Sequence, residues 1–203
     1  MPDLDRWRAT WRGLGAAPDE ALYRELMARY AEPHRAYHTA RHLDECFARL
    51  DEAAALAGQI HEVGLALWFH DAIYEARKHD NEERSATWAR TAALQAGVPD
   101  TVAGRVHDLI LATKHDAAPV AGDAALVTDI DLAILAAPAD RFDEYERQIR
   151  QEYSWVPGFL FRRKRREILE GFLARPHIYA TGHFRERWEA PARANLERSL
   201  GNP

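Results

Sequence analysis

Apolar residues recur every three or four positions along most of the chain, which is the spacing of one face of an α-helix. In the stretch from 43 to 54, Leu43, Phe47 and Leu50 share one face, and charged residues occupy the other. The same period predicts further helices over residues 60–74, 82–96, 100–113, 124–135, 141–153, 159–173 and 184–200. No stretch alternates apolar and polar residues over the length of a strand, so the pattern predicts an all-α fold.

The segments between the predicted helices are short, and no internal repeat, low-complexity run or long linker divides the chain. Polar residues and helix breakers predict loops near Pro33, at 117–122 and at 155–158. We therefore expect a single helical domain over residues 1–203, with its core at about 30–200.

The composition is typical of a protein that folds around one apolar core without covalent help. Of the 203 residues, 47% are hydrophobic, which is enough for one core at this length. The single cysteine, Cys46, cannot form an internal disulfide. Because it lies on an apolar helix face, we expect a small buried hydrophobe there.

Charge and hydropathy bear on the partners and the location of the protein. The 27 Lys and Arg against 32 Asp and Glu give a formal net charge of -5, whereas binding to nucleic-acid phosphates normally needs a cationic surface. Residues 1–12 lack the apolar run of a signal peptide. The most apolar run, 63–69, is far shorter than the roughly 20 residues of a membrane span. We expect a cytoplasmic protein without a nucleic-acid or membrane partner, and a homodimer stays open.

Histidines and aspartates gather at three places in this helical pattern. His38 and His42 are four residues apart and so share one face of a helix. His70 and Asp71 end the most apolar predicted helix, where an ionised carboxylate is costly unless something compensates its charge. A divalent cation is the strongest compensation available. Mixed imidazole and carboxylate ligands suit Mn, Zn, Ni, Co, Fe or Mg.

The third place is the predicted helix over residues 124–135, which we expect Asp123 to cap at its N-terminus. Asp129 and Asp131 lie inside its otherwise apolar sequence. Residues two apart on a helix point about 200° away from each other. Only one of these carboxylates should therefore reach a site shared with the histidines, and the spacing alone leaves open which one.

The order of these residues resembles that of the HD superfamily of metal-dependent phosphohydrolases, and in particular a small bacterial subgroup described as predicted HD-domain phosphohydrolases. The matching motifs, between about residues 37 and 195, are Tyr37-His38 with His42, Phe69-His70-Asp71 with Tyr74, Asn81-Glu82 with Ser85, Thr113 with His115, Asp131-Leu132, and Arg150 with Glu152-Tyr153. The resemblance implies a helical bundle with a central metal site, and it favours Asp131 over Asp129. The metal ligands that it implies are His42, His70, Asp71 and Asp131.

The resemblance also implies roles beside the metal. The Tyr-His-x-x-x-His opening is similar to that of cyclic-nucleotide phosphodiesterases, which makes His38 the general acid that protonates the leaving group. Thr39 stands where those enzymes usually have Asn. Glu82 is a candidate proton-handling residue, or a first-turn residue favoured by the helix dipole. His115 is a candidate contact to a second metal or to the substrate phosphate, or a plain helix-terminal histidine.

The activity implied is metal-dependent hydrolysis of a phosphate ester of a small, nucleotide-like substrate. The cations expected near its phosphate are Arg41, Lys78, Lys114 and Arg150. One alternative is a di-iron HD-type oxygenase, which needs two more histidine ligands from among His79, His107 and His115. Another is a catalytically silent HD module that binds a nucleotide as a sensor. The native metal, and whether one or two ions bind, stay open.

Overall fold

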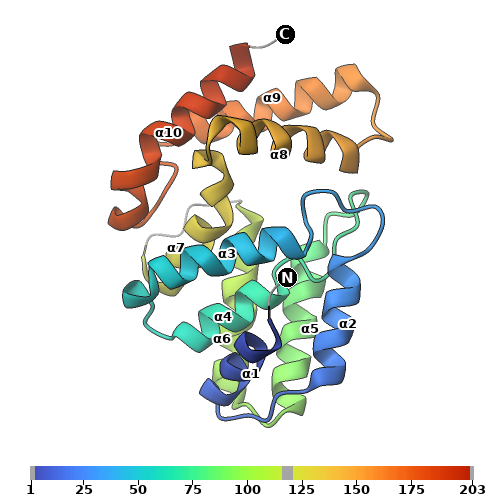
Figure 1. The fold of residues 1–203 in the computed structure, drawn as a ribbon, viewed down its shortest axis with the longest axis vertical. Helices are drawn as coiled ribbons and strands as arrows, with labels where there is room; N and C mark the ends of the chain where they lie inside the picture. Colours follow the sequence, from blue (N-terminus) through green and yellow to red (C-terminus); the bar gives the residue numbers. More distant parts are fainter. Residues whose placement is uncertain (1–2, 116–120, 202–203) are drawn as a thin grey trace.

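The computed structural model describes residues 3–115 and 121–201, and all regular structure in these residues is helical. The α-helices are α1 (Leu4–Gly13), α2 (Glu20–Tyr30), α3 (Ala40–Glu52), α4 (Ile60–Phe69), α5 (Asn81–Gln95), α6 (Asp100–Leu111), α7 (Gly122–Asp131), α8 (Ala139–Glu152), α9 (Gly158–Ala174) and α10 (Gly182–Gly201) (Figure 1). Short 3-10 turns are η1 (Ala54–Leu56), η2 (Ala112–Lys114) and η3 (Leu132–Ala136). The all-α prediction is confirmed. The expected loop at 117–122 lies mostly outside the described residues.

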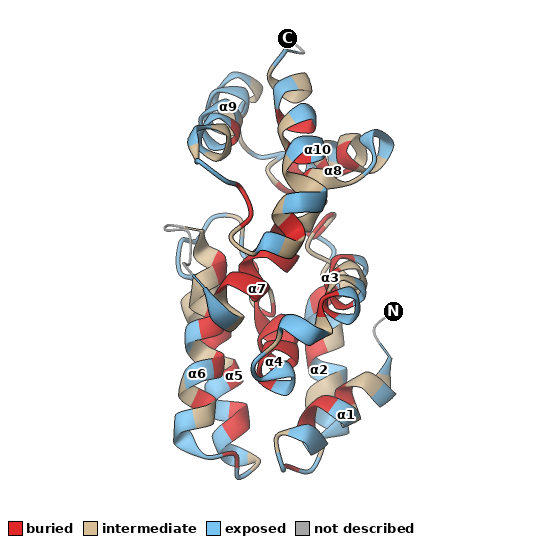
Figure 2. Ribbon diagram, turned by 90° about the vertical axis from the view of Figure 1, so that its left-hand side faces the viewer, coloured by how far each residue is buried: buried red, intermediate tan, exposed pale blue. Residues whose placement is uncertain are grey.

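Helix α4 forms the centre of the bundle. Every residue from Glu62 to Phe69 is buried, and the helix contacts α1, α3, α5, α6 and α7. Figure 2 shows the buried residues concentrated where α3, α4 and α7 meet. A helix that is apolar on all sides belongs inside a protein, so the most apolar run of the sequence becomes its core. None of the described helices is long and apolar enough to cross a membrane.

The two N-terminal helices, α1 and α2, were not among the predicted elements. Asp3 and Asp19 cap them by accepting backbone N–H groups of the first turn. Trp7 and Trp11 of α1 are fully buried, and Trp7 packs edge-on against Trp68 of α4 with ring centroids 5.3 Å apart. The apolar core therefore begins at Trp7, well before the expected boundary.

Helices α8, α9 and α10 form a second group beside the bundle of α1 to α7 (Figure 1). Turn η3 connects the two groups and contacts both α8 and α10. Asn195 of α10 fastens this connection, because its Nδ2 donates to the carbonyls of Leu135 at 2.9 Å and Ala137 at 2.8 Å. Only Leu169 of α9 is buried, so most of this helix faces solvent or the pocket described below.

Asp123 does not cap the helix that it was expected to cap. It is the second residue of α7, and its carboxylate accepts the N–H groups of Gly58 at 2.7 Å and Gln59 at 2.9 Å, just before α4. The N-cap position is Ala121, which has no side-chain acceptor. The prediction was wrong because the donors that Asp123 satisfies lie in a segment far away in the sequence.

Candidate metal centre

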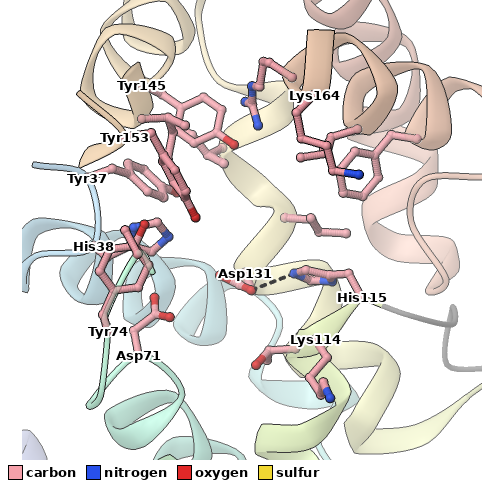
Figure 3. A pocket seen from close by; sticks show the side chains of 18 of the residues that line it. Tyr37, His38, Asp71, Tyr74, Lys114, His115, Asp131, Tyr145, Tyr153 and Lys164 are labelled. Carbon is pink, nitrogen blue, oxygen red and sulfur yellow. Dashed lines mark hydrogen bonds and ion pairs between the residues drawn. The ribbon is translucent and has the colours of Figure 1, made fainter. Parts of the chain in front are cut away.

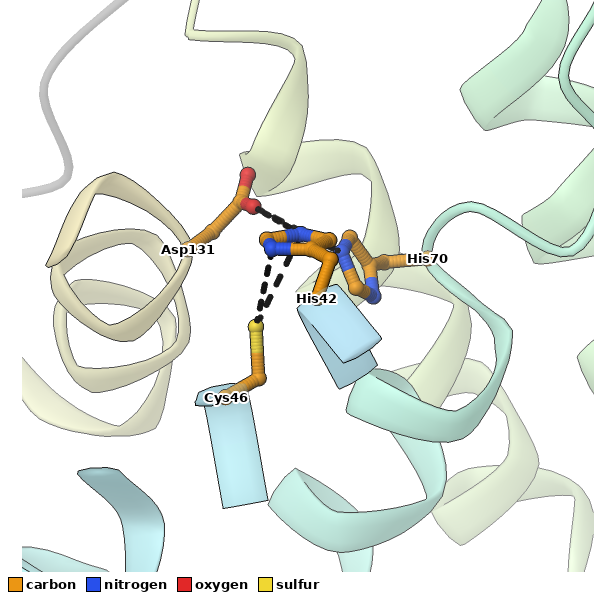
Figure 4. Close-up of side chains that lie close together, drawn as sticks. All are labelled: His42, Cys46, His70 and Asp131. Carbon is orange, nitrogen blue, oxygen red and sulfur yellow. Dashed lines mark hydrogen bonds and ion pairs between the residues drawn. The ribbon is translucent and has the colours of Figure 1, made fainter. Parts of the chain in front are cut away.

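The residues expected to bind metal meet where three helices begin or end. His42 lies in the first turn of α3, and Asp131 is the last residue of α7. His70 and Asp71 directly follow α4, which ends at Phe69 and not near residue 74 as predicted. Because α3, α4 and α7 contact one another, these side chains converge, and Figure 4 shows His42, His70 and Asp131 together.

Their imidazole nitrogens and carboxylate oxygens face one another. His42 Nε2 lies 3.1 Å from both His70 Nε2 and Asp131 Oδ1. Asp71 Oδ2 lies 3.0 Å from His70 Nε2 and 3.5 Å from His42 Nε2. Ligand atoms at about 2.1 Å from one ion are about 3.0 Å apart in octahedral and about 3.4 Å apart in tetrahedral geometry. The observed distances are therefore those of atoms that can share an ion.

The hydrogen bonds and charges around the cluster also suit a cation. His70 Nδ1 donates to the carbonyl of Leu67 at 2.9 Å, which leaves Nε2 as the lone-pair nitrogen. Within the described residues, only histidines come within ion-pair distance of Asp71 and Asp131. Burial raises the pKa of Asp131, but hydrogen bonds from His115, His42 and His70 outweigh it and hold this pKa well below its usual value. The cluster thus contains ionised carboxylates without a lysine or arginine partner.

Cys46 adds a thiol to this group. Its Sγ lies 3.7 and 3.8 Å from the two ring nitrogens of His42 (Figure 4). His42, Cys46, His70 and Asp131 offer ligand atoms within 4.8 Å of one another and could bind a metal ion. Cys46 is buried, as expected of a small hydrophobe. Its place beside His42 was missed, although their four-residue spacing puts both on one helix face.

Asp129 and Asp131 point in different directions, as residues two apart on a helix must. The Asp129 carboxylate is completely buried and accepts the N–H groups of Ala180 at 2.8 Å and Thr181 at 2.7 Å, just before α10. Asp129 therefore anchors α10, and Asp131 is the carboxylate that reaches the histidines.

His38 lies next to the cluster and is held by a buried carboxylate that the sequence analysis did not assign to the site. Glu152, the last residue of α8, accepts from His38 Nδ1 at 2.7 Å through Oε2. Its Oε1 accepts the backbone N–H groups of Ala36, Tyr37 and His38 at 2.7, 2.8 and 3.0 Å. Tyr74 donates to Oε2 at 2.9 Å. With Nδ1 occupied, the nitrogen that His38 has left for a ligand is Nε2.

The electrostatics favour a protonated His38. Burial lowers its pKa, but the carboxylates of Asp71 and Glu152 outweigh burial and raise this pKa above its ordinary value. For Glu152, burial acts in the other direction and raises the pKa. The charge of His38 and the hydrogen bonds to Glu152 outweigh burial and lower this pKa to about 2. An imidazole that carries a proton beside an ionised carboxylate can act as a general acid.

A buried arginine, Arg35, connects the segment that carries His38 with the segment that carries Asp71. Arg35 donates through Nη1 to the carbonyls of Asp71 at 2.6 Å and His38 at 3.1 Å, and through Nη2 to that of Ala72 at 3.1 Å. Thr39 does not hold His38. Its hydroxyl accepts from the N–H of Arg41 at 3.3 Å and caps α3. His38 is therefore oriented by Arg35 and Glu152.

A cavity of about 770 Å³ opens onto the cluster (Figure 3). His38, Asp71 and Asp131 form part of one wall. Aromatic and apolar residues from α8, α9 and the loop between them line much of the rest of the cavity, and they include Tyr145, Ile149, Tyr153, Trp155, Phe161 and Phe172. The cavity therefore joins a polar, metal-suited end to a largely apolar one.

Four more of the predicted site residues line this cavity, namely Lys78, Glu82, Lys114 and His115. His115 Nε2 lies 2.9 Å from Asp131 Oδ2, on the side of that carboxylate away from His38. Burial raises the pKa of Glu82. Lys114 pairs with Glu83 at 2.6 Å.

Arg41 and Arg150, both expected near the phosphate, do not line the cavity. Arg41 is exposed and pairs with Glu144 at 2.6 Å, between α3 and α8. Arg150 donates to the carbonyls of Tyr153 and Val156 and stabilises the end of α8. Both guanidinium groups make these contacts outside the cavity, and a role for them at the phosphate stays a prediction.

Of the other histidines that a di-iron site would recruit, His79 is exposed at the rim of the cavity. His107 pairs with the exposed Asp108 at 3.0 Å and lies outside the cavity. Among these three histidines, only His115 contacts the cluster.

Comparisons of the chain with protein-family models, with curated proteins and with solved structures find no match. The chain has a buried group of histidine, cysteine and aspartate side chains that could bind a metal ion.

Proposed function

We propose that this chain is a metal-dependent phosphohydrolase of the HD type that acts on a phosphate ester of a small, nucleotide-like substrate. The observation that carries the proposal is the cluster, in which every distance from the Nε2 of His42 or His70 to the nearest carboxylate oxygen of Asp71 or Asp131 lies between 3.0 and 3.5 Å. The ligands in this proposal are His42, His70, Asp71 and Asp131.

A divalent ion held by these residues supplies Lewis-acid activation of a phosphoryl oxygen and of an attacking water. His38 donates its proton from Nε2 to the oxygen of the leaving group. Glu152 holds Nδ1, and the stacked ring of Tyr74, with its centroid 4.1 Å from that of His38, limits rotation of the imidazole. The acid is thus fixed in position before substrate binds.

The aromatic wall supports a substrate with a flat organic part. The ring centroid of Tyr153 lies 6.4 Å from that of Trp155 and 6.3 Å from that of Phe161. Stacking of a nucleobase on an aromatic side chain contributes about 1–3 kcal/mol. A cavity of about 770 Å³ is typical of sites for small organic ligands. These features favour a nucleotide-sized ester over inorganic phosphates.

Treatment with a chelator should abolish hydrolysis, and a divalent metal should restore it. Purified protein is first analysed for bound metal and tested on p-nitrophenyl phosphate, its bis-ester and a panel of nucleotides. It is then stripped with EDTA and reloaded with Mn, Zn, Ni, Co, Fe or Mg in turn. Hydrolysis that continues at the untreated rate after the metal has been removed contradicts the proposal.

Replacing Glu152 with glutamine should slow turnover by about 100-fold or more while the metal stays bound, because general-acid catalysis contributes about 10²- to 10⁴-fold. The glutamine carbonyl can still accept backbone N–H groups, but its amide cannot stabilise a protonated His38. The pKa of His38 then falls, and the alkaline limb of the kcat–pH profile moves to lower pH. A rate loss without this displacement would mean that Glu152 has only a structural role.

A further inference from the structure

The cations that line the cavity differ in whether an acidic partner already neutralises them. Lys114 pairs with Glu83 at 2.6 Å, Lys164 pairs with Glu167 at 3.2 Å, and Arg165 pairs with Glu146. A phosphate must compete with these carboxylates for such cations, so they are poor anchors for it.

Arg175 is different. It follows α9 and lines the cavity, and no carboxylate of the described chain lies within ion-pair distance of it. Burial alone lowers its pKa, with no acidic group acting in the opposite direction. Lys78 also lacks an ion pair among the described residues, but it is exposed, whereas Arg175 is half-buried. Among the described residues, Arg175 is therefore the half-buried cavity cation without an acidic partner.

Its neighbours hold Arg175 in place. Nη2 donates to the backbone carbonyl of His115 at 2.9 Å. The guanidinium carbon lies 4.6 Å from the ring centroid of Phe172. Within the described residues, Nε and Nη1 have no hydrogen-bond partner, so a planar edge with free donors remains. Such an edge matches the oxygens of a phosphate.

This guanidinium is linked to the candidate metal centre through His115. It donates to the backbone carbonyl of His115, whose imidazole contacts Asp131 at 2.9 Å. Figure 3 shows His115 and His38 on opposite sides of Asp131. An anion bound between these two histidines would face His38 on one side and, on the other, His115, whose carbonyl accepts a hydrogen bond from Arg175.

We propose that Arg175 binds the phosphate group of the ligand, through its non-bridging oxygens, from the side of the cavity opposite His38. The proposal deepens the proposed function and rests on it for the choice of phosphate as the anion. It also gives a physical reason for the missing counterion. A half-buried charge is costly when it is unpaired, and a bound phosphate supplies its partner.

The test is calorimetric titration of inorganic phosphate into the full, metal-loaded chain. Arg175→Gln removes the charge but keeps a donor for the carbonyl of His115, and it should weaken phosphate binding by about 10- to 100-fold. Arg175→Lys keeps the charge without the planar guanidinium group. Its affinity for phosphate should lie between those of the wild type and of Arg175→Gln. Arg162→Ala is the matched control, because Arg162 is an exposed α9 cation outside the cavity. It should bind phosphate like the wild type.

Three results overturn the proposal, namely wild-type protein that does not bind phosphate, Arg175 variants that bind it as tightly as the wild type, and an equal loss in Arg162→Ala. Phosphate binding needs no turnover. The protein could therefore bind phosphate through Arg175 and yet hydrolyse no ester. That result would contradict the proposed function and support the role of Arg175 in phosphate binding. For an ester that is hydrolysed, Arg175→Gln should raise KM more than it lowers kcat.

Discussion

Replacing Asp71 with alanine should remove the bound metal and the hydrolytic activity together, while the helical fold stays intact. Asp71 supplies one of two carboxylates to the cluster, with Oδ2 at 3.0 Å from His70 Nε2. Even residues that only orient metal ligands commonly contribute 10- to 100-fold to affinity, so loss of a ligand should cost more than about 100-fold. Metal content after dialysis, initial rates and circular dichroism measure the three effects.

Cys46→Ala is the informative companion, because the thiol belongs to the same buried group. Its Sγ is almost equally close to Nδ1 and Nε2 of His42, at 3.8 and 3.7 Å. The other ligand atoms gather around Nε2. We therefore expect Cys46→Ala to keep its metal. If Cys46→Ala loses metal and Asp71→Ala retains it, the thiolate is the ligand and the set proposed above is wrong.

Helical periodicity predicted the fold class and the existence of eight helices, α3 to α10, because apolar residues recur at helical spacing in their sequences. It did not predict α1 and α2. These helices have 10 and 11 residues and carry many charges, so they show little pattern of their own. Their packing depends on aromatic residues that meet Trp68 of α4, namely Trp7 from α1 and Tyr23 from α2, and no local rule specifies that contact.

For the site, the sequence could indicate which residues are costly to bury, but not what they meet. His42, His70 and Asp131 come from three helices, and their order in the chain was enough to group them. Glu152 belongs to one of the motifs that carry the family resemblance, but the sequence predicted no role for it in the site. It is buried because it accepts hydrogen bonds from a loop 114 to 116 residues earlier in the chain. Contacts between residues so far apart in the chain produce no periodic pattern in the sequence.

Replacing His38 with alanine should leave the metal bound and slow turnover by about 10²- to 10⁴-fold, the usual effect of losing a general acid. His38 is anchored by Glu152 at 2.7 Å, and its ring centroid lies 6.1 Å from that of His42. The penalty should shrink for p-nitrophenyl esters, because p-nitrophenolate departs without a proton. Metal content and rates on good and poor leaving groups, measured on the same preparations, give both results.

A variant with both His38→Ala and Glu152→Gln tests whether Glu152 acts on the reaction through His38. If Glu152 acts on the reaction through His38, adding Glu152→Gln to His38→Ala should slow turnover little beyond the single His38 variant, because coupled residues are not additive. Multiplying rate losses would mean that the two residues act independently. If His38→Ala loses metal as Asp71→Ala does, His38 is a ligand. An unchanged rate on both kinds of leaving group would show that His38 takes no part in the chemistry, and the protonated imidazole beside Glu152 would then be only a structural ion pair.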